Sequence, residues 1–260
     1  MEEDPETIAR EVARALRAGR RAVAFTGAGA SAESGVMPFR APGAAGVLWS
    51  GLALLGLPLA GDGRAWHAWP RVAHFFYSRF FLAGVLAAAP NACHTFLADC
   101  GMPVVTTNVD GLHERAGAPP EQVAAVHGTV LEEICAGCGR PLPDCARVHP
   151  CCGYPRPAAL LFHDAIHPAA AIAGGGRAHD LVHAMQGADT PLLFIVGVSW
   201  ALPTFACLLS EMRSYGARVI HVNLAPPPER VAAPGDAWVR EPAAVFFGRC
   251  RAAYFGSGDL

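Results

Sequence analysis

A glycine turn behind an apolar run is the first place where residue types and spacing suggest chemistry. Residues 22–25 read AVAF, which is typical of a strand buried on both faces of a sheet. Gly27, Ala28 and Gly29 follow, and Ser31 comes two residues later. Glycines at a strand end let backbone N–H groups approach a diphosphate without a Cβ in the way. This spacing predicts a nucleotide phosphate site, and a plain structural turn is the alternative.

Polar or small residues also follow four further apolar runs, where the strands of a sheet would end. The runs are MPVVTT, VAAV, LLFIV and RVIHV, at residues 102–107, 123–126, 192–196 and 218–222. The residues after them are, in order, Asn108 with Asp110, then His127, then Gly197 with Ser199, and then Asn223. Doubly wound parallel sheets bind ligands beyond the carboxyl ends of their strands. We therefore expect an α/β fold with one parallel sheet and a ligand at this edge.

Cysteines supply a second kind of chemistry. Five of the nine lie between Cys135 and Cys152, and the N-terminal residues lack the cationic and apolar pattern of a secretion signal. The odd number and this setting predict a reducing cytoplasm and a metal rather than a disulfide scaffold. Cys135 and Cys138 form a C-x-x-C knuckle whose soft thiolates suit tetrahedral zinc. Because residues 134–157 interrupt the alternation of strands and helices, we expect a small inserted module that the metal ties down.

Composition and periodicity indicate the elements that would position these residues. With 260 residues, 52% of them apolar and 16% charged, the chain can fill a large core. Its formal charge of −2 gives no basic surface for nucleic acid. An i, i+4 spacing of apolar residues from Ile8 to Leu16 indicates an amphipathic helix, and residues 66–89 and 91–100 read as further helices. The most apolar stretch, residues 191–209, contains a glycine and a proline, which favours a strand and a turn over a membrane span.

In chain order, these segments resemble the sirtuin family, the NAD-dependent protein deacylases. The matching segments, over about residues 20 to 225, are GAGASAESGVMPFR, TTNVDGLHERAG, VHGTV, the cysteine module, RPAALLF, VGVSW and HVNL. The resemblance implies a Rossmann-like NAD-binding domain formed by residues 1–40, 90–130 and 158–260. A smaller domain would contain a helical module, residues 41–89, and a zinc module, residues 131–157. NAD and an acyl-lysine would meet in the cleft between the two domains.

The resemblance also implies roles for the residues at the strand ends. His127 would be the general base, because an imidazole with a pKa of roughly 6.5 can take a proton from a ribose hydroxyl near neutrality. Asn108, the second catalytic candidate, and Asp110 would hold the nicotinamide-side ribose, a water and the carboxamide. The implied cofactor contacts are Gly27, Ala28, Gly29, Ser31, Phe39, Arg40, Thr107, Asn108, Asp110, Gly197, Ser199 and Asn223. Thr107 stands where the family has Gln, so we expect a change in how the ribose is held.

By the same register, zinc would be held by Cys135, Cys138, His149 and Cys152, with Cys151 or Cys145 as alternatives in the second pair. The segment HFFYSRFF followed by PNACH is similar to the sirtuin branch that removes acidic acyl groups, where a Tyr and an Arg three residues later hold the acyl carboxylate. Phe76 replaces that Tyr, and Arg79 matches the Arg, which can bind a carboxylate through two N–H donors. His163-Asp164 replaces the family's Gly-Glu at the edge where a substrate peptide adds as a strand.

The sequence thus predicts a cytoplasmic, zinc-containing enzyme that uses NAD to remove acyl groups, with a preference for acidic ones, from lysine in a protein or a small molecule. Its products would be nicotinamide and an O-acyl-ADP-ribose. ADP-ribosyl transfer or NAD hydrolysis is the second hypothesis, because the chain departs from the family at Met37-Pro38, Thr107 and His163-Asp164. A non-catalytic NAD-binding module is the third hypothesis. We expect no nucleic-acid or membrane partner.

Overall fold

A parallel sheet of six strands organises the fold in the computed structural model, which describes residues 2–36, 61–136, 138–142, 154–164, 167–199 and 205–256. In spatial order the strands are β3 (Val123–Ala125), β2 (Val104–Thr106), β1 (Ala22–Thr26), β6 (Leu192–Val196), β7 (Arg218–Val222) and β8 (Ala237–Val239). Every pairing is parallel, so all six carboxyl ends lie at one edge of the sheet. The strand order reverses between β1 and β6, which is where doubly wound sheets bind ligands. The predicted α/β class with a Rossmann-like parallel sheet is therefore confirmed.

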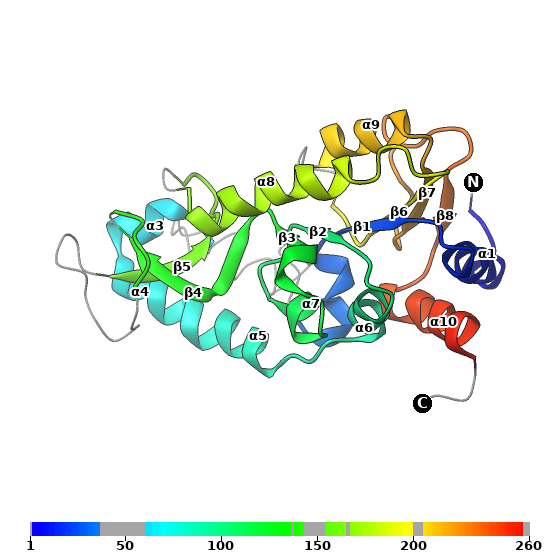
Figure 1. Cartoon of the computed structure of the whole chain (residues 1–260). Coiled ribbons are helices and arrows are strands. Elements are labelled where there is room, and N and C mark those ends of the chain that lie inside the picture. Colours follow the sequence, from blue (N-terminus) through cyan, green and yellow to red (C-terminus); the bar gives the residue numbers. More distant parts are fainter. Residues whose placement is uncertain are drawn as a thin grey trace.

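Helices cover both faces of this sheet (Figure 1). On one face lie α8 (Ala169–His183) and α9 (Ala206–Ser214), and on the other lie α1 (Pro5–Arg17), α6 (Ala92–Asp99) and α10 (Ala243–Phe255). Phe96 and Phe246 belong to the core on the second face, and Val182 and Met212 to the core on the first. Because both faces are covered, the inner strands are buried throughout and read as unbroken apolar runs.

The first helix, α1, agrees with the apolar spacing that predicted it. The Asp4 carboxylate accepts a hydrogen bond from the Thr7 N–H at 2.9 Å and so caps the helix. Ile8 and Val12 are fully buried against the sheet. The short helix predicted after Pro90 is also confirmed, as α6.

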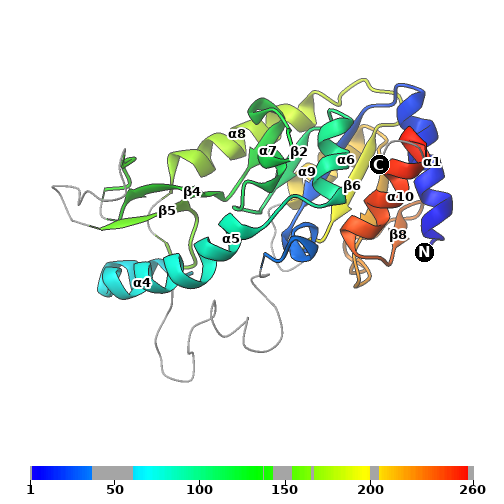
Figure 2. The same cartoon turned by 90° about the horizontal axis from the view of Figure 1, so that it is seen from below.

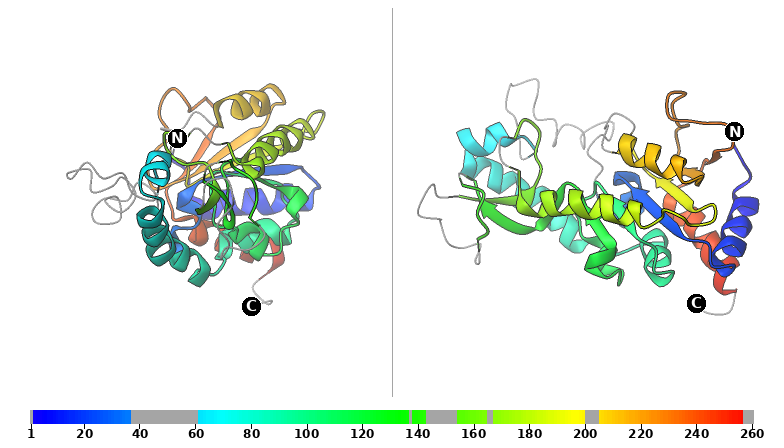
Figure 3. Two further views of the ribbon diagram at one scale, coloured as in Figure 1. Left: turned by 90° about the vertical axis from the view of Figure 1, so that its left-hand side faces the viewer. Right: turned by 45° about the horizontal axis from the view of Figure 1, so that its top comes forward.

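A second group of elements extends to one side of the sheet (Figures 2 and 3). It contains α3 (Gly63–Ala68), α4 (Pro70–Phe76), a π-helical segment (Tyr77–Leu82), α5 (Ala83–Ala87) and an antiparallel hairpin of β4 (Gly128–Cys135) and β5 (Pro155–Ala159). These elements have their own apolar core, which includes Trp66, Tyr77 and Val130. The small part of the molecule therefore has a packing centre separate from the two cores of the sheet.

The single helix predicted over residues 66–89 is wrong. The helical path breaks at Trp69, whose backbone has φ −139° and ψ +61°. Pro70 lacks an N–H group and disfavours a helical residue before it, so a new helix starts there. Further along, the Tyr77–Leu82 turn widens to π-helix. Such widened turns occur mostly as local insertions within α-helices, and they change which face each later side chain occupies.

Among the described residues, no single helix is long and apolar enough to cross a membrane. The segments Pro70–Ala87 and Ala92–Asp99 together reach the required length and composition, but they are bent by 57° with respect to each other. In the second of them, Cys93, Phe96 and Leu97 are fully buried in the core of the sheet domain.

Candidate functional site

Backbone atoms from the ends of β1 and β6 contact each other directly. The N–H groups of Gly27 and Gly29 donate to the carbonyls of the last β6 residue and of Gly197, at 2.9 and 3.0 Å. A Cβ on Gly29 would lie 2.5 Å from the Gly197 Cα, and Gly197 itself has φ +58°. Only glycine allows this approach at both positions. The predicted residues Gly27, Ala28, Gly29 and Gly197 therefore lie together in one glycine turn, where a short 3-10 turn starts at Ala28.

Asn108 links the end of β2 to this glycine turn. Its side-chain Nδ2 donates to the Gly27 carbonyl and to the Ser31 hydroxyl oxygen, both at 3.0 Å. Its backbone N–H donates to the Thr106 Oγ1 at 3.0 Å, which fixes the residue from both ends. No donor in the described part of the chain reaches the other amide atom, Oδ1. Asn108 thus presents a rigidly oriented acceptor suited to a ribose hydroxyl or a water.

Asp110 is a buried carboxylate beside Asn108, with 3% of its surface exposed. Burial raises its pKa above the ordinary value, and hydrogen bonds from the Leu112 N–H and from Ser31 oppose that rise. The Leu112 N–H donates to Oδ1 at 3.0 Å and belongs to the first turn of α7 (Leu112–Arg115). Asp110 is therefore a buried carboxylate whose position is fixed by the first turn of α7, and a carboxylate can accept further N–H donors.

Arg115, in the last turn of α7, joins this part of the site to the small helical group. Its guanidinium donates to the Val85 carbonyl at 3.1 Å and to the Ala88 carbonyl at 2.5 Å. These carbonyls lie at the C-terminal end of α5, where helix carbonyls lack intrahelical partners. The end of α5 is thereby fixed to the helix that follows Asp110.

His127 follows β3 and lies where the sheet passes into the hairpin. Its carbonyl accepts the Leu160 N–H at 2.8 Å. The next residue, Gly128, has φ +78°, and a Cβ on it would lie 2.2 Å from the Ala158 carbonyl oxygen. Burial holds the pKa of the half-buried His127 imidazole below its ordinary value, although a hydrogen bond to the Thr107 backbone opposes this shift. The ring is neutral near pH 7 and able to accept a proton.

Thr107, which follows β2, forms hydrogen bonds to the end of β1. Its N–H donates to the Thr26 carbonyl at 3.0 Å, and its hydroxyl lies 3.4 Å from the same oxygen. Thr107 also provides the backbone group that His127 contacts. Hydrogen bonds therefore connect the ends of β1, β2 and β3, and they bring His127 to the same edge as the glycine turn.

The end of β7 completes this edge. The Asn223 side-chain Nδ2 donates to the Val198 carbonyl at 3.0 Å, and its backbone N–H donates to the Val239 carbonyl at 3.1 Å. Ser199, one residue beyond Val198, is exposed. Asn223 and Ser199 are thus on adjacent strand exits, as the sequence predicted. Phe39 and Arg40 lie outside the described residues.

Two of the expected zinc ligands lie among the described residues. Cys135 is the last residue of β4, and Cys138 lies in the turn that follows. His149 and Cys152, and the alternatives Cys151 and Cys145, fall outside the described residues. Within the ranges that are described, no group of three or more potential ligands is close enough to hold a metal.

The two residues expected to bind an acyl group lie on the interrupted helix of the small part. Phe76 ends α4 and is half-buried, and Arg79 is exposed in the π-helical segment. The tyrosine between them, Tyr77, points into the core, where its hydroxyl donates to the Val130 carbonyl at 2.7 Å. Of the two residues expected to bind an acyl group, Arg79 is the one with a polar side chain.

His163 and Asp164 have separate structural partners. Asp164 accepts two hydrogen bonds from the fully buried guanidinium of Arg156, at 2.9 and 2.5 Å. His163 has φ +53°, a left-handed conformation in a residue other than glycine, and its Nδ1 lies 3.2 Å from the Asp62 carboxylate. Arg64 binds the same Asp62 carboxylate. The carboxylate at residue 164 is thus fixed in a buried ion pair that the sequence did not predict.

Two buried histidines lie near the glycine turn: His113, for which the sequence favours a structural role, and His94, which sequence reasoning missed. His94 is completely buried and His113 is 2% exposed, and their ring centroids are 4.8 Å apart. Burial lowers the pKa of His94 to about 4. Burial and the neighbouring His94 hold the pKa of His113 well below its ordinary value. His94 occurs in the segment PNACH, and its place three residues after a helix-capping Asn was a signal that could have identified it.

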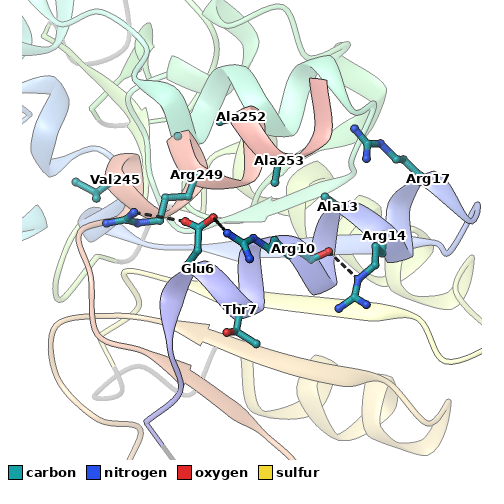
Figure 4. Close-up of a pocket in the computed structure, with 11 residues that line it drawn as sticks. Glu6, Thr7, Arg10, Ala13, Arg14, Arg17, Val245, Arg249, Ala252 and Ala253 are labelled. Carbon is teal, nitrogen blue, oxygen red and sulfur yellow. Dashed lines mark hydrogen bonds and ion pairs between the residues drawn. The ribbon is translucent and has the colours of Figure 1, made fainter. Parts of the chain in front are cut away.

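A groove between α1 and α10 lies away from this edge (Figure 4). Arg10 and Arg249 on its walls both pair with Glu6, at 3.1 and 3.6 Å. The guanidiniums of Arg14 and Arg17 contact backbone carbonyls. The groove contains none of the residues at the strand ends, so it is separate from the candidate site.

Comparison with known proteins agrees with this geometry. The model of the Sir2 family matches residues 27–199. An NAD-dependent protein deacylase of Aeropyrum pernix is 35% identical over 251 residues, which cover 91% of this chain and 93% of that protein. NAD-dependent protein deacylase 1 of Pseudomonas aeruginosa is 34% identical over 262 residues, which cover 90% of this chain and 94% of that protein. A mutant Sir2 homologue solved with ADP-ribose superimposes with a TM-score of 0.71 at 25% identity and covers 100% of both chains. The chain belongs to the Sir2 family.

Proposed function

We propose that this protein is an NAD-dependent lysine deacylase that transfers the acyl group to ADP-ribose and releases nicotinamide. Its membership of the Sir2 family and its two relatives named as protein deacylases support this activity. The observation that carries the assignment of the site is the hydrogen-bonded edge where the ends of β1, β2 and β3 meet. That edge presents glycine backbone at Gly27 and Gly29, an acceptor on Asn108 and an imidazole on His127.

The chain's own groups have distinct tasks in this reaction. Bound NAD supplies the anomeric carbon that the substrate's acyl oxygen attacks as nicotinamide leaves. Asn108 Oδ1 accepts a hydrogen bond from a ribose hydroxyl or a water, and the Asp110 carboxylate accepts the N–H of the carboxamide. His127, kept neutral by burial, then takes a proton from the ribose hydroxyl that attacks the acyl carbon.

We further propose that Arg79 favours acyl groups that end in a carboxylate. A guanidinium can bind a carboxylate through two N–H donors, which gives both energy and geometric specificity. The hydroxyl of Tyr77 is occupied by the Val130 carbonyl, and Phe76 has no hydroxyl, so Arg79 would act without a phenol beside it. We expect the preference for acidic acyl groups to be weaker than a Tyr and Arg pair would give.

We also propose that the protein binds zinc as a structural ion. The Gly139 N–H donates to the Cys135 carbonyl, and the Cys135 N–H donates to the Arg140 carbonyl, both at 2.9 Å. This tight turn places Cys138 on the same loop as Cys135 and fits half of a tetrahedral thiolate site. His149 and Cys152, or Cys151 or Cys145 in their place, would supply the other half. The ion would tie the hairpin to its loop and take part in no chemical step.

The test is to incubate the protein with NAD and lysine peptides that carry acetyl, succinyl or malonyl groups, and to measure nicotinamide and deacylated peptide together. Equal amounts of both products support the proposal, and faster turnover of the succinyl and malonyl peptides supports the role of Arg79. Nicotinamide without deacylated peptide would point instead to ADP-ribosyl transfer or NAD hydrolysis. If neither product forms while NAD still binds, the chain is a binding module.

Two histidine variants make this test specific for the site. His127→Ala should abolish deacylation and leave NAD affinity largely intact, because the base acts after the cofactor has bound. His179→Ala, on the exposed face of α8, should leave both unchanged. Deacylation by His127→Ala at the parental rate would remove His127 from the mechanism. The proposed setting for the activity is the cytoplasm, which the use of cysteines predicts.

A further inference from the structure

The groove between α1 and α10 carries arginines that the proposed function does not use (Figure 4). Arg10, Arg14 and Arg17 are spaced four and three residues apart on α1, so they lie along one face of that helix. Arg249 lies on the other wall, on α10. All four residues are exposed. Because the whole chain has a formal charge of −2, this concentration of positive charge is a local feature and does not follow from the composition.

Acidic side chains neutralise one end of the groove. Glu6 pairs with Arg10 at 3.1 Å and with Arg249 at 3.6 Å. Glu241, which does not line the groove, also binds Arg249, at 3.2 Å. Two carboxylates thus balance two guanidiniums at this end, and it offers little net charge to a ligand.

The other end of the groove has no acidic partner. Arg14 and Arg17 form no ion pair with any described residue, and their guanidiniums donate to the backbone carbonyls of Arg10 and Tyr254. The remaining acid of α1, Glu11, binds an arginine of β7 and does not line the groove. The last turn of a helix favours cations, but Arg10 and Arg14 are like charges at i and i+4, which repel each other. The end formed by Arg14 and Arg17 is therefore a pair of cations without a counter-charge.

The groove has an apolar lining of small residues and fixed walls. Ala13, Gly248 and Ala252 line it between the arginines, and a Cβ on Gly248 would meet no heavy atom within 4 Å. The hollow measures about 1120 Å³, which is more than the roughly 300–1,000 Å³ of pockets for small ligands. Val12 and Phe247 bury the opposite faces of the two helices in the core. The walls are thus in place before a ligand binds, which lowers the entropic cost of binding.

These features favour an extended acidic peptide over a nucleic acid. Among the described residues, no aromatic side chain lines the groove, so nucleotide bases would find no ring to stack on. In an extended peptide every second side chain points the same way, about 6.6 Å apart. Arg10 and Arg14 are separated by about 6 Å along the axis of α1, which is close to that repeat. A guanidinium can bind each carboxylate through two parallel N–H donors.

We propose that the groove between α1 and α10 is a docking site for an extended acidic segment of a partner protein. Carboxylates of the segment bind Arg14 and Arg17, and its backbone lies over Ala13 and Gly248. None of these residues belongs to the strand-end site, so the proposal does not depend on the proposed function. The groove would hold a partner on a face of the enzyme away from the bound NAD.

The first test measures binding to the full chain by fluorescence anisotropy of a labelled peptide of alternating Glu and Ser residues. We expect saturable binding that weakens as the salt concentration rises, because exposed charges are screened. The same peptide with Gln in place of Glu should not bind. Binding that ignores salt, no binding of the Glu peptide at low salt, or tighter binding of a single-stranded DNA of equal charge would each overturn the proposal.

The second test uses charge variants. Arg14→Gln and Arg17→Gln should each weaken binding of the Glu peptide about twofold to fivefold, as loss of one exposed ion pair implies. The double variant should weaken it about tenfold. Arg140→Gln is the matched control, because it removes an exposed arginine that follows β4 and does not line the groove. Equal affinities of the double variant and the control would overturn the proposal.

The third test fills the groove and leaves its charge unchanged. Gly248→Leu places its side chain in the open hollow, and leucine favours a helix more than glycine does, so the variant should melt no lower than the parent. We expect it to bind the Glu peptide at least about fivefold more weakly, as either arginine variant does at most. Parental binding by this folded variant would overturn the placement in the groove. NAD affinity in calorimetry should stay parental throughout, so a chain that binds the peptide but not NAD would contradict the proposed function alone.

Discussion

Two adjacent glycines in α8 should respond in opposite ways to the same substitution. Gly174 is buried against β3, and a Cβ on it would lie 2.1 Å from the Ala125 carbonyl oxygen and 2.6 Å from the Ala125 carbonyl carbon. Gly175 is exposed, and a Cβ there would meet no heavy atom within 4 Å. Gly174→Ala and Gly175→Ala therefore differ only in what the new methyl group contacts.

The expected magnitudes follow from two opposing terms. Replacing glycine by alanine inside a helix stabilises it by about 1 kcal/mol at either position. At Gly174 the methyl group would be roughly 1 Å too close to backbone atoms, and overpacking of this kind costs about 1–3 kcal/mol. A backbone carbonyl cannot rotate away as a side chain can, so we take the upper end. Gly174→Ala should then lose about 2 kcal/mol, and Gly175→Ala should gain about 1 kcal/mol.

Urea unfolding and thermal melting of the two variants provide the assay. A difference of about 3 kcal/mol corresponds to a separation in Tm of roughly 6–12 °C for a chain of this length. Because His127 lies two residues beyond Ala125, Gly174→Ala should also lower kcat for deacylation at temperatures where it remains folded. If Gly174→Ala is as stable as the parent, α8 does not lie on β3 at this distance and the reasoning is refuted.

Three further predictions concern the ion pair, the glycine turn and the base. Asp164→Ala leaves the guanidinium of Arg156 buried without its partner and should lower the free energy of unfolding by about 3–5 kcal/mol in urea titration. An unchanged midpoint would contradict the buried pair. Gly197→Ala places a Cβ 2.4 Å from the Gly29 Cα and should weaken NAD binding in calorimetry at least tenfold, and parental affinity would contradict the backbone contact. Burial lowers the pKa of His127, and the base must be neutral to act, so activity should be lost only below the ordinary histidine pKa of about 6.5. We therefore expect the midpoint of the acid limb of the kcat–pH profile to lie below about pH 6.5, and a midpoint above that value would contradict a neutral buried base.

The sheet was predictable because its strands are short apolar runs that end in small or polar residues. The outer strand β8 was missed because its three residues, AWV, pair with only one neighbour and form no longer run. Helix α8 was missed because its first half is almost entirely Ala and Gly, which gives no apolar period. One of those small residues, Gly174, approaches β3 closely, and this approach is visible only in three dimensions.

The candidate site was predictable where its residues follow strands directly. His127, Asn108 and Asn223 occupy strand ends, and parallel topology brings strand ends together whatever lies between them in sequence. His94 and Arg156 do not follow a strand directly, so the sequence gives no comparable signal for them. A buried polar residue is recognised by its hydrogen-bond partners, which are known only once the chain has folded. The roles of the individual cofactor and zinc residues stay predictions, and Phe39, Arg40 and the second pair of zinc ligands lie outside the described residues.

The contact that Arg115 makes with the end of α5 has a practical consequence for redesign. The guanidinium fixes the C-terminal end of the small helical group to the helix behind Asp110 through the Val85 and Ala88 carbonyls, and the side chains of both residues are buried in the core of the small part. The helices further upstream could therefore be exchanged for those of a relative with a different acyl specificity. A chimaera that keeps this last turn and its backbone acceptors should retain the affinity for NAD while its choice of substrate changes.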